Sequence, residues 1–442
     1  MTDKRQHIGI VGGGMLGMTL AHRLARQGNR VTLFESADQL GGLTSTWKLG
    51  DVIWDRFYHV ILLSDQALRN LLAELDLEQH IQWTETRTGF YTDGNLYSLS
   101  NSIDFMRFPP LGLLDKFRLA VNILYASRIK NWQRLETVFA TDWLRRWSGE
   151  ATLQKIWLPL LRAKLGSAYD KASAAFIWAI IARLYGARKS GLKKEMFGYV
   201  PGGYATILEK FTGVLQQQGV AIRTNHRAQR VQRNSAGNIT ISFANGKTEN
   251  VDKVVLTVPS PVASDLCARL SKDEKKKLEN IRYLGIVCAS VLLKKPLAHY
   301  YVTNITDSAF PFTGVIEMTS IVDRSRFGGY SLIYLPKYLP VGDDFWNNSD
   351  DQVRELFVSK LADMYPGFDP NDIVEFKIAR AKYVFALSTI DYSQNLPSMQ
   401  TSIPGVYVIN SAHIVNGTLN VNETVQLAEK AVNIVTDEKE ID

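Results

Sequence analysis

The stretch that most constrains the fold is His7–Glu35, which reads HIGIVGGGMLGMTLAHRLARQGNRVTLFE. Ile8–Val11 is an apolar run of β-forming residues with the length of one buried strand. Leucines then recur at every fourth residue, which places them on one face of a helix. Gly28 ends that helix, and the apolar run Val31–Phe34 leads directly into Glu35. The pattern predicts a strand, helix and strand in a parallel sheet.

Gly12, Gly14 and Gly17 stand between the first strand and the helix at the spacing G-x-G-x-x-G. Glycine at these positions allows a tight turn, lets backbone N–H groups approach a pyrophosphate, and lets helix and strand pack closely. The helix N-terminus adds partial positive charge beside the phosphates. Glu35 can accept hydrogen bonds from an adenosine ribose, and its carboxylate disfavours a cofactor with a 2′-phosphate. Together these residues predict a dinucleotide site.

A second glycine pair, Gly41-Gly42, follows Glu35 after a short polar stretch. It lets another loop pass close to the pyrophosphate, as the extended dinucleotide FAD requires. An ordinary turn is the alternative. The FAD interpretation is favoured because the pair follows a complete dinucleotide-binding pattern of strand, glycine loop, helix, strand and acid.

The composition narrows the function classes. The chain has 442 residues, enough for two domains, and its 51 basic and 44 acidic residues give a formal net charge of +7. A solvated surface explains this positive excess, and attraction to anionic lipid or to a phosphorylated substrate is the alternative. The chain has no basic tract of the kind that indicates nucleic-acid binding. Cys267 and Cys288 make no disulfide framework, so we expect a reducing, cytoplasmic location. We expect neither a signal peptide nor a transmembrane helix.

The segment Trp54–Ile61, WDRFYHVI, follows the second glycine pair. With it, the chain resembles the FAD-dependent amine oxidase superfamily, which includes protoporphyrinogen oxidases and carotenoid desaturases. Gly405–Val435 resembles the closing strand, loop and helix of that superfamily, whose helix N-terminus points at the flavin pyrimidine edge. The chain departs from the pattern at Leu43-Thr44, where members often carry Arg, and at Asn410-Ser411, where an acidic residue is usual.

The resemblance implies an α/β fold: a Rossmann-like FAD/NAD(P)-binding domain with an inserted α+β substrate domain of helices and an antiparallel sheet. We expect the FAD-binding domain in three parts, residues 1–98, 196–265 and 391–442. The substrate domain then comprises a helical part, residues 99–195, and a sheet part, residues 266–390.

Residues 284–335 are rich in Val, Ile, Tyr, Phe and Thr, which favours several antiparallel strands. The last of these is predicted at Tyr330–Leu335. Pro336 and Pro340 follow it and predict that the strand ends there, because proline cannot donate to a sheet ladder.

The resemblance also assigns site residues. His59 and Tyr383 are the catalytic candidates beside the flavin, although packing roles are common for both residue types. The implied cofactor-binding residues are Gly12, Gly14, Met15, Leu16, Gly17, Glu35, Ser36, Gly41, Gly42, Leu43, Thr44, Tyr58, His59, Val231, Thr257, Pro259, Asn410, Ser411, Leu419, Asn420 and Val421. Neither cysteine lies in the C-terminal segment where some relatives attach the flavin, so we expect non-covalent FAD. The sequence has no H-E-x-x-H or C-x-x-C motif, so we expect no metal.

Three functions fit this pattern. The first is an FAD-dependent oxidoreductase that takes a hydride from a C–N or C–C bond of a fairly apolar small-molecule substrate. The second is a flavin-dependent sugar-nucleotide isomerase resembling UDP-galactopyranose mutase, which would suit a convergence of Arg56, Arg183, Arg188 and Arg324 on a diphosphate. The third is a non-enzymatic flavoprotein that serves as a partner.

Large apolar residues gather between Phe105 and Phe117, close to Arg107, Lys116 and Arg118. A helical lid packed on its own core explains them. They also fit peripheral contact with a membrane surface, which enzymes of lipophilic substrates use.

Overall fold

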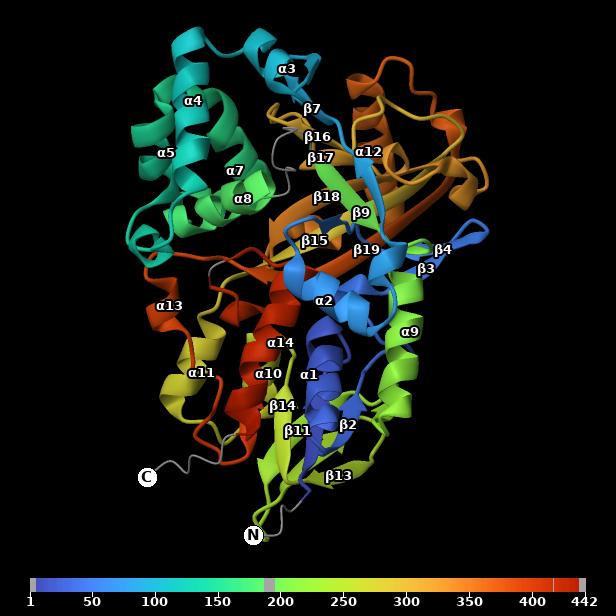
Figure 1. The fold of residues 1–442 in the computed structure, drawn as a ribbon, viewed down its shortest axis with the longest axis vertical. Helices are drawn as coiled ribbons and strands as arrows, with labels where there is room; N and C mark the ends of the chain where they lie inside the picture. Colours follow the sequence, from blue (N-terminus) through green and yellow to red (C-terminus); the bar gives the residue numbers. More distant parts are fainter. Residues whose placement is uncertain (1–4, 187–194, 416, 437–442) are drawn as a thin grey trace.

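The computed structural model describes residues 5–186, 195–415 and 417–436, which are coloured in Figure 1. A five-stranded parallel sheet lies in the lower half of that view and a seven-stranded sheet in the upper half, with a group of helices beside it. The α/β architecture predicted from the sequence is confirmed. Across the described residues, no helix combines the length and apolar character needed to cross a membrane.

The five-stranded sheet has the strand order β10-β2-β1-β14-β20, and all neighbours are parallel. Three separate parts of the chain supply its strands. These are β1 (His7–Val11), β2 (Arg30–Phe34), β10 (Ala221–Arg223), β14 (Lys253–Leu256) and β20 (Val406–Val408). The sheet therefore unites the two ends of the chain with its middle.

Helices cover one face of this sheet: α1 (Met15–Arg26), α9 (Gly203–Gln217) and α14 (Val421–Thr436), with α2 (Gln66–Glu74) above them. Their apolar residues form one core with the strands. The antiparallel strands β11 (Ala228–Arg233), β12 (Ile239–Phe243) and β13 (Thr248–Val251) share a second core with the sheet.

Two short helices, α10 (Ser260–Leu266) and α11 (Lys272–Glu279), bury Leu266 and Leu278 in that second core. The segment that begins at residue 266 therefore packs first on the parallel sheet, although the sequence analysis assigned it to the substrate sheet. The chain reaches the seven-stranded sheet only at Tyr283.

The seven-stranded sheet has the order β19-β15-β18-β17-β16-β7-β8 and is antiparallel except between β16 and β7. Its strands are β7 (Thr88–Thr92), β8 (Asn95–Ser98), β15 (Tyr283–Leu293), β16 (Val302–Ile305), β17 (Gly314–Glu317), β18 (Ser331–Pro340) and β19 (Ile373–Ala386). The hairpin β7–β8 belongs to this sheet, so the boundary predicted at residue 98 is wrong. Helix α12 (Asp350–Met364) packs on one face.

Strand β18 continues through Pro336 to Pro340, so the predicted end at Leu335 is wrong. The carbonyl of Pro336 accepts a hydrogen bond from Thr313 N, on the side away from β15. In an antiparallel strand the N–H and C=O of a residue point to the same side. The N–H that Pro336 lacks would therefore have pointed towards β17, which begins only at Gly314. The hydrogen bonds between β18 and β15 are unaffected.

The remaining elements are two small sheets, a group of helices and one short helix, which connect the two large sheets. Small sheets are formed by β3 (Thr46–Leu49) with β4 (Val52–Asp55), and by β5 (Ile61–Leu62), β9 (Met196–Tyr199) and β6 (Gln82–Glu85). The helical group comprises α3 (Ser102–Arg107), α4 (Leu113–Ala126), α5 (Ala140–Ser148), α6 (Glu150–Thr152), α7 (Leu158–Leu165) and α8 (Ala174–Gly186). Helix α13 (Tyr392–Asn395) precedes β20.

Candidate functional site

The glycine turn after β1 leaves no room for side chains. Gly12 has φ +115°, and a Cβ there would lie 2.4 Å from Thr257 Oγ1. A Cβ on Gly17 would lie 1.9 Å from the carbonyl oxygen of Gly12. Thr257 ties the turn down, because its hydroxyl donates to the carbonyls of Val11 and Gly12 at 3.1 and 3.0 Å. The turn is built by sterics that only glycine satisfies.

The second glycine pair lies directly on this turn. Gly41 N donates to Gly13 O at 2.8 Å, and the φ angles of Gly41 and Gly42 are +126° and +57°. A Cβ on Gly42 would lie 3.1 Å from the Cα of Gly14. Two backbone loops from different parts of the chain thus form one cradle without side chains.

The N-terminus of α1 opens into this cradle. Its N-cap is Gly14, which supplies no side-chain acceptor, and the first turn carries no acid. The side chains of Met15 and Leu16 are buried in the core, so only their backbone N–H groups can meet a ligand. Free N–H groups and the helix dipole favour an anion here.

Glu35 is fixed at the edge of the cradle. One carboxylate oxygen accepts from Gly13 N at 2.7 Å, and the other accepts from Ser36 Oγ and Ala37 N at 2.9 and 2.8 Å. The residue is 9% exposed. Gly12, Gly13, Glu35 and the second glycine pair therefore occupy one place, as an elongated dinucleotide would require.

The segment after β4 brings Asp55 and His59 together. Asp55 is 2% exposed, accepts from Tyr204 N at 2.9 Å, and lies 3.7 Å from Nδ1 of His59. Burial raises the pKa of the Asp55 carboxyl, and the nearby His59 opposes this only in part. Nδ1 of His59 also lies 3.0 Å from the carbonyl of Phe57, so it carries the proton. Asp55 belongs to the segment Trp54–Ile61 that carries the family resemblance, but it was not among the predicted site residues.

The side chain of Tyr58 contacts the seven-stranded sheet at Tyr338 of β18. Its hydroxyl and that of Tyr338 share a hydrogen bond of 2.7 Å. Burial raises the pKa of Tyr58, and it raises the pKa of Tyr338 to about 12, so both rings stay neutral. Tyr338 packs against two apolar clusters, one of the helical group and one of the sheet. The pair therefore lies where the two parts of the substrate domain meet.

Lys164 of α7 lies at the same junction. Its ammonium is 5.2 Å from the ring centre of Tyr338 and 5.8 Å from that of Phe385. Desolvation, reinforced by the positive charge of Arg183, lowers the pKa of Lys164 to about 8. Among the described residues no carboxylate pairs with it. The sequence offered no signal for this residue, because its partners lie far along the chain.

Tyr383 of β19 lies in a different network. Its ring is 5.5 Å from that of Tyr283, whose hydroxyl lies 3.2 Å from Ser260 N and 3.1 Å from Ser260 Oγ. Asn410 adjoins these residues: its amide donates to Val258 O at 2.9 Å and its carbonyl oxygen accepts from Ala412 N at 3.0 Å. The Asn410 side chain is thus engaged by the protein itself.

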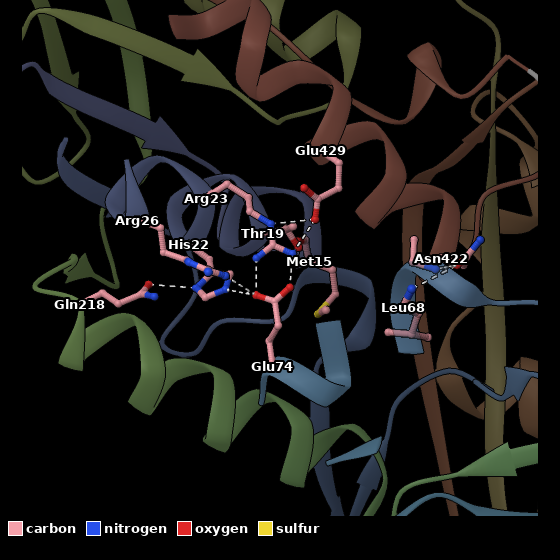
Figure 2. A network of polar contacts seen from close by, with 11 residues as sticks. Met15, Thr19, His22, Arg23, Arg26, Leu68, Glu74, Gln218, Asn422 and Glu429 are labelled. Atoms are coloured by element: carbon pink, nitrogen blue, oxygen red, sulfur yellow. Dashed lines mark hydrogen bonds and ion pairs between the residues drawn. The ribbon is translucent and has the colours of Figure 1, made fainter. Parts of the chain in front are cut away.

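The N-terminus of α14 is organised by two asparagines. Asn420 accepts from Glu423 N at 3.0 Å and caps the helix. Asn422 instead reaches α2, where its side-chain oxygen accepts from the N–H groups of Ala67 and Leu68 at 3.0 and 3.1 Å (Figure 2). Leu419 packs against the cores of both domains. The start of α14 therefore lies at the junction between them.

The other predicted cofactor residues lie around these loops. Leu43 is in the short helical turn Gly42–Thr44, and Thr44 Oγ1 donates to Gly41 O at 2.9 Å. Pro259 is the N-cap of α10. The Val231 side chain is 1% exposed, so only its backbone can reach a ligand.

Of the four arginines proposed to converge, the three that the structure describes have separate partners. Arg183 pairs with Asp65 at 3.0 Å, Arg56 donates to Thr46 O, and Arg324 donates to Lys294 O. Arg188 lies outside the described residues. The part of the chain that the structure describes also holds no group of three or more His, Cys, Asp or Glu residues able to bind a metal.

A polar cluster holds the helices around the cradle together (Figure 2). Glu74 of α2 accepts from Arg23 at 2.5 and 2.8 Å, from Arg26 at 2.8 Å, and lies 3.0 Å from Nε2 of His22. Arg23 continues to Glu429 of α14. Partial burial favours a higher pKa for Glu74, but hydrogen bonds from Arg23 and His22 outweigh it and lower that pKa to about 2.

The parallel sheet, the glycine cradle and the fixed acid define a protein with a Rossmann-type dinucleotide-binding site. The model of the family "Flavin containing amine oxidoreductase" matches residues 16–435, so the chain belongs to this family. Its cofactor is FAD.

Comparisons with known proteins agree with this assignment. The chain is 20% identical over 434 residues to the 15-cis-phytoene desaturase of Narcissus pseudonarcissus, covering 92% of this chain and 75% of that protein. It is 28% identical over 272 residues to the coproporphyrinogen III oxidase of Mycobacterium bovis, covering 57% and 58%. The crystal structure of reduced UDP-galactopyranose mutase has the same fold, with a TM-score of 0.73 at 16% identity over 97% of this chain and 93% of that one.

Proposed function

We propose that the protein oxidises a fairly apolar small molecule by taking a hydride from one of its C–N or C–C bonds. Bound FAD supplies the hydride acceptor, and the protein binds, orients and shields the reactants. The observation that carries the proposal is the junction of Tyr58, Tyr338, Lys164 and Phe385, because it is aromatic and poor in carboxylates. Such surroundings exclude water from a hydride transfer.

The cradle is proposed to hold the diphosphate. No side chain projects from the backbone at Gly12, Gly14 or Gly42, and the uncapped N-terminus of α1 supplies donors. Glu35 is already held by Gly13 N, and its carboxylate is the acceptor for ribose hydroxyls.

Residues near Tyr58 are proposed to face the substrate side. His59 carries its proton on Nδ1, so Nε2 is the ring atom available to accept a proton or hydrogen bond. Asp55 orients that ring from a buried position 3.7 Å away. Tyr383 is proposed to act nearer the Tyr283 network, as an aromatic wall.

The test is anaerobic reduction of the purified holoenzyme. We expect that a polyene, a porphyrinogen or an apolar amine bleaches the visible flavin absorbance, and that reducing the flavin does not create tight binding of UDP-galactopyranose. A flavin that resists every donor of these classes but is reduced by dithionite would contradict the proposed reaction. Tight binding of a UDP-sugar only after reduction would favour an isomerase instead.

The FAD is proposed to be non-covalent, because both cysteines are buried and neither belongs to the C-terminal stretch 405–435. Acid precipitation should therefore leave the yellow colour in the supernatant. Colour that remains in the protein pellet would contradict this.

We also propose a cytoplasmic location with peripheral contact to a membrane. The two cysteines are free thiols, which suits a reducing compartment, and apolar substrates partition into lipid. Cell fractionation should find a part of the protein on membranes that an alkaline carbonate wash releases. Protein that stays in the membrane pellet after such a wash would contradict peripheral contact.

A further inference from the structure

Helix α4 presents its apolar side to solvent. The exposed fractions are 72% for Leu113, 69% for Leu114 and 67% for Phe117, and further along the same face 38% for Val121 and 41% for Leu124. In α3, Ile103 and Met106 are 61% and 55% exposed. We call these residues, with Tyr125, the α3–α4 surface. Single exposed apolar residues are ordinary, but a contiguous group indicates an interaction site.

The opposite face of α4 carries polar residues into the protein. Lys116 is 7% exposed and its ammonium donates to Met106 O at 2.7 Å. Asn122 is 0% exposed and its amide donates to Ser148 Oγ at 2.7 Å. The buried face of α4 is thus mixed: Lys116 and Asn122 lie beside the apolar residues Leu119 and Ala126. The Lys116 ammonium and the Asn122 amide N–H have hydrogen-bond acceptors, whereas Asn122 Oδ1 has no partner among the described residues. The exposed apolar stripe likewise has no partner in the described part of the chain.

Positive charges surround the exposed stripe. Arg107 follows Met106 directly in the chain, and Arg128 donates to Leu124 O at 3.0 Å. Arg118 donates to Arg146 O, and Lys155 donates to Pro110 O in the connection between α3 and α4. Among the described residues none of these four cations has a carboxylate partner, while Asp104 and Asp115 are the acids on the two helices.

The position of this surface suits a planar partner. Helices α3 and α4 lie at one end of the molecule, at the top of Figure 1, and the five-stranded sheet lies at the other. Tyr125 stacks on Trp147 with ring centres 4.2 Å apart, which places two amphipathic aromatic rings beside the stripe. Such rings are enriched where protein meets the lipid headgroup region.

We propose that the α3–α4 surface inserts into the headgroup boundary of a membrane that contains anionic lipid. The apolar stripe enters the acyl boundary, and the surrounding arginines and Lys155 contact lipid phosphates and carboxylates. This identifies the surface for the membrane contact proposed above. It does not depend on the redox reaction, so a chain that bound vesicles without a reducible flavin would leave it standing.

The test is flotation of the FAD-loaded protein with vesicles. Binding to phosphatidylcholine vesicles that contain phosphatidylserine should exceed binding to phosphatidylcholine alone and fall as salt is added. The variant Leu113→Gln/Leu114→Gln/Phe117→Gln should bind at least about tenfold more weakly. A matched control is Ile53→Gln/Leu356→Gln/Val374→Gln, which removes apolar residues that are 59%, 37% and 39% exposed elsewhere.

Flavin content and melting temperature report whether each variant is folded. Equal vesicle binding by both triple variants, or none by the unmodified protein, would overturn the proposal. So would a dimer in light scattering that the Leu113, Leu114 and Phe117 changes dissociate, because the surface would then bind a second copy. Arg107→Gln/Arg128→Gln/Lys155→Gln should abolish the preference for phosphatidylserine, and an unchanged preference would refute the role of charge.

Discussion

Replacing Glu74 by Gln should loosen the helices that carry the cradle. The carboxylate joins α2 to Arg23, Arg26 and His22 of α1, and through Arg23 to Glu429 of α14 (Figure 2). Glutamine has the same shape but no charge. It therefore leaves Arg23, which is only 15% exposed, with one counter-charge in place of two.

The magnitude follows from the pKa. A fall from the ordinary 4.5 to about 2 for Glu74 corresponds to about 3 kcal/mol of stabilisation of the charged form. Because this carboxylate is 31% exposed, solvent screening reduces the expected loss to roughly 2 kcal/mol. For cooperative unfolding of a chain of this size, that loss lowers the melting temperature by about 2 °C.

The assay is thermal unfolding followed by flavin fluorescence at several pH values. A carboxylate with a lowered pKa stabilises the fold above its unfolded pKa of 4.5 and loses that effect as the pH falls towards 2. The gap between the two proteins should thus be constant from neutral pH to about pH 5 and narrow below 4.5.

The matched control is Glu78→Gln. Glu78 is 33% exposed and its ion-pair partner among the described residues is Arg69, so its loss should cost less than about 1 kcal/mol. Equal melting temperatures for Glu74→Gln and the unmodified protein at neutral pH, or a gap that persists unchanged at low pH, would refute the reasoning.

Three further predictions concern the candidate site. Gly17→Ala should prevent retention of FAD through gel filtration, because its Cβ would meet backbone at 1.9 Å, whereas Gly213→Ala, with nothing within 4 Å, should retain it. Lys164→Met should remove a transition near pH 8 from the rate of flavin reduction, because Lys164 is charged below about 8 and neutral above it; Lys164→Arg should make the rate independent of pH there. Tyr58→Phe should cost about 1–2 kcal/mol in thermal unfolding, and Tyr58→Phe/Tyr338→Phe should cost less than the sum of the two single changes.

The first unit of the fold was predictable because its signals are local. The spacing from Gly12 to Gly17 encodes a steric requirement, because a Cβ on Gly17 would meet Gly12 O only a few residues away. Thr257, which also restricts Gly12, comes from far along the chain. Strands β1 and β2 pair in parallel and are joined by the single crossover helix α1, whose apolar period is visible in the sequence. Glu35 could be identified for the same reason, since it ends the second strand of that unit.

The substrate side was not predictable in this way, because its contacts join distant parts of the chain. Tyr58 and Tyr338 are 280 positions apart, and no periodicity relates them. The same holds for β7, which pairs with β16 across about two hundred residues. Pro336 shows a different kind of error. The residue type argued for a strand end, but the missing N–H of Pro336 points away from β15 to a place where β17 has not yet begun. No ladder hydrogen bond is therefore lost, and this could not be read from the residue type.

Helix α4 shows why an amphipathic pattern does not decide which side faces the protein. Periodicity separates a face with Lys116 and Asn122 from a face with Leu113 and Phe117, and the hydrophobic effect alone would bury the second. The first can be buried because Met106 O and Ser148 Oγ accept from the donors of Lys116 and Asn122, and because Leu119 and Ala126 lie on the same buried face. Each apolar side chain left outside forgoes roughly 1 kcal/mol or more. A partner that buries this helix face would recover the lost free energy, and this best explains why the apolar side chains are exposed. Lipid is the partner that the surrounding arginines favour.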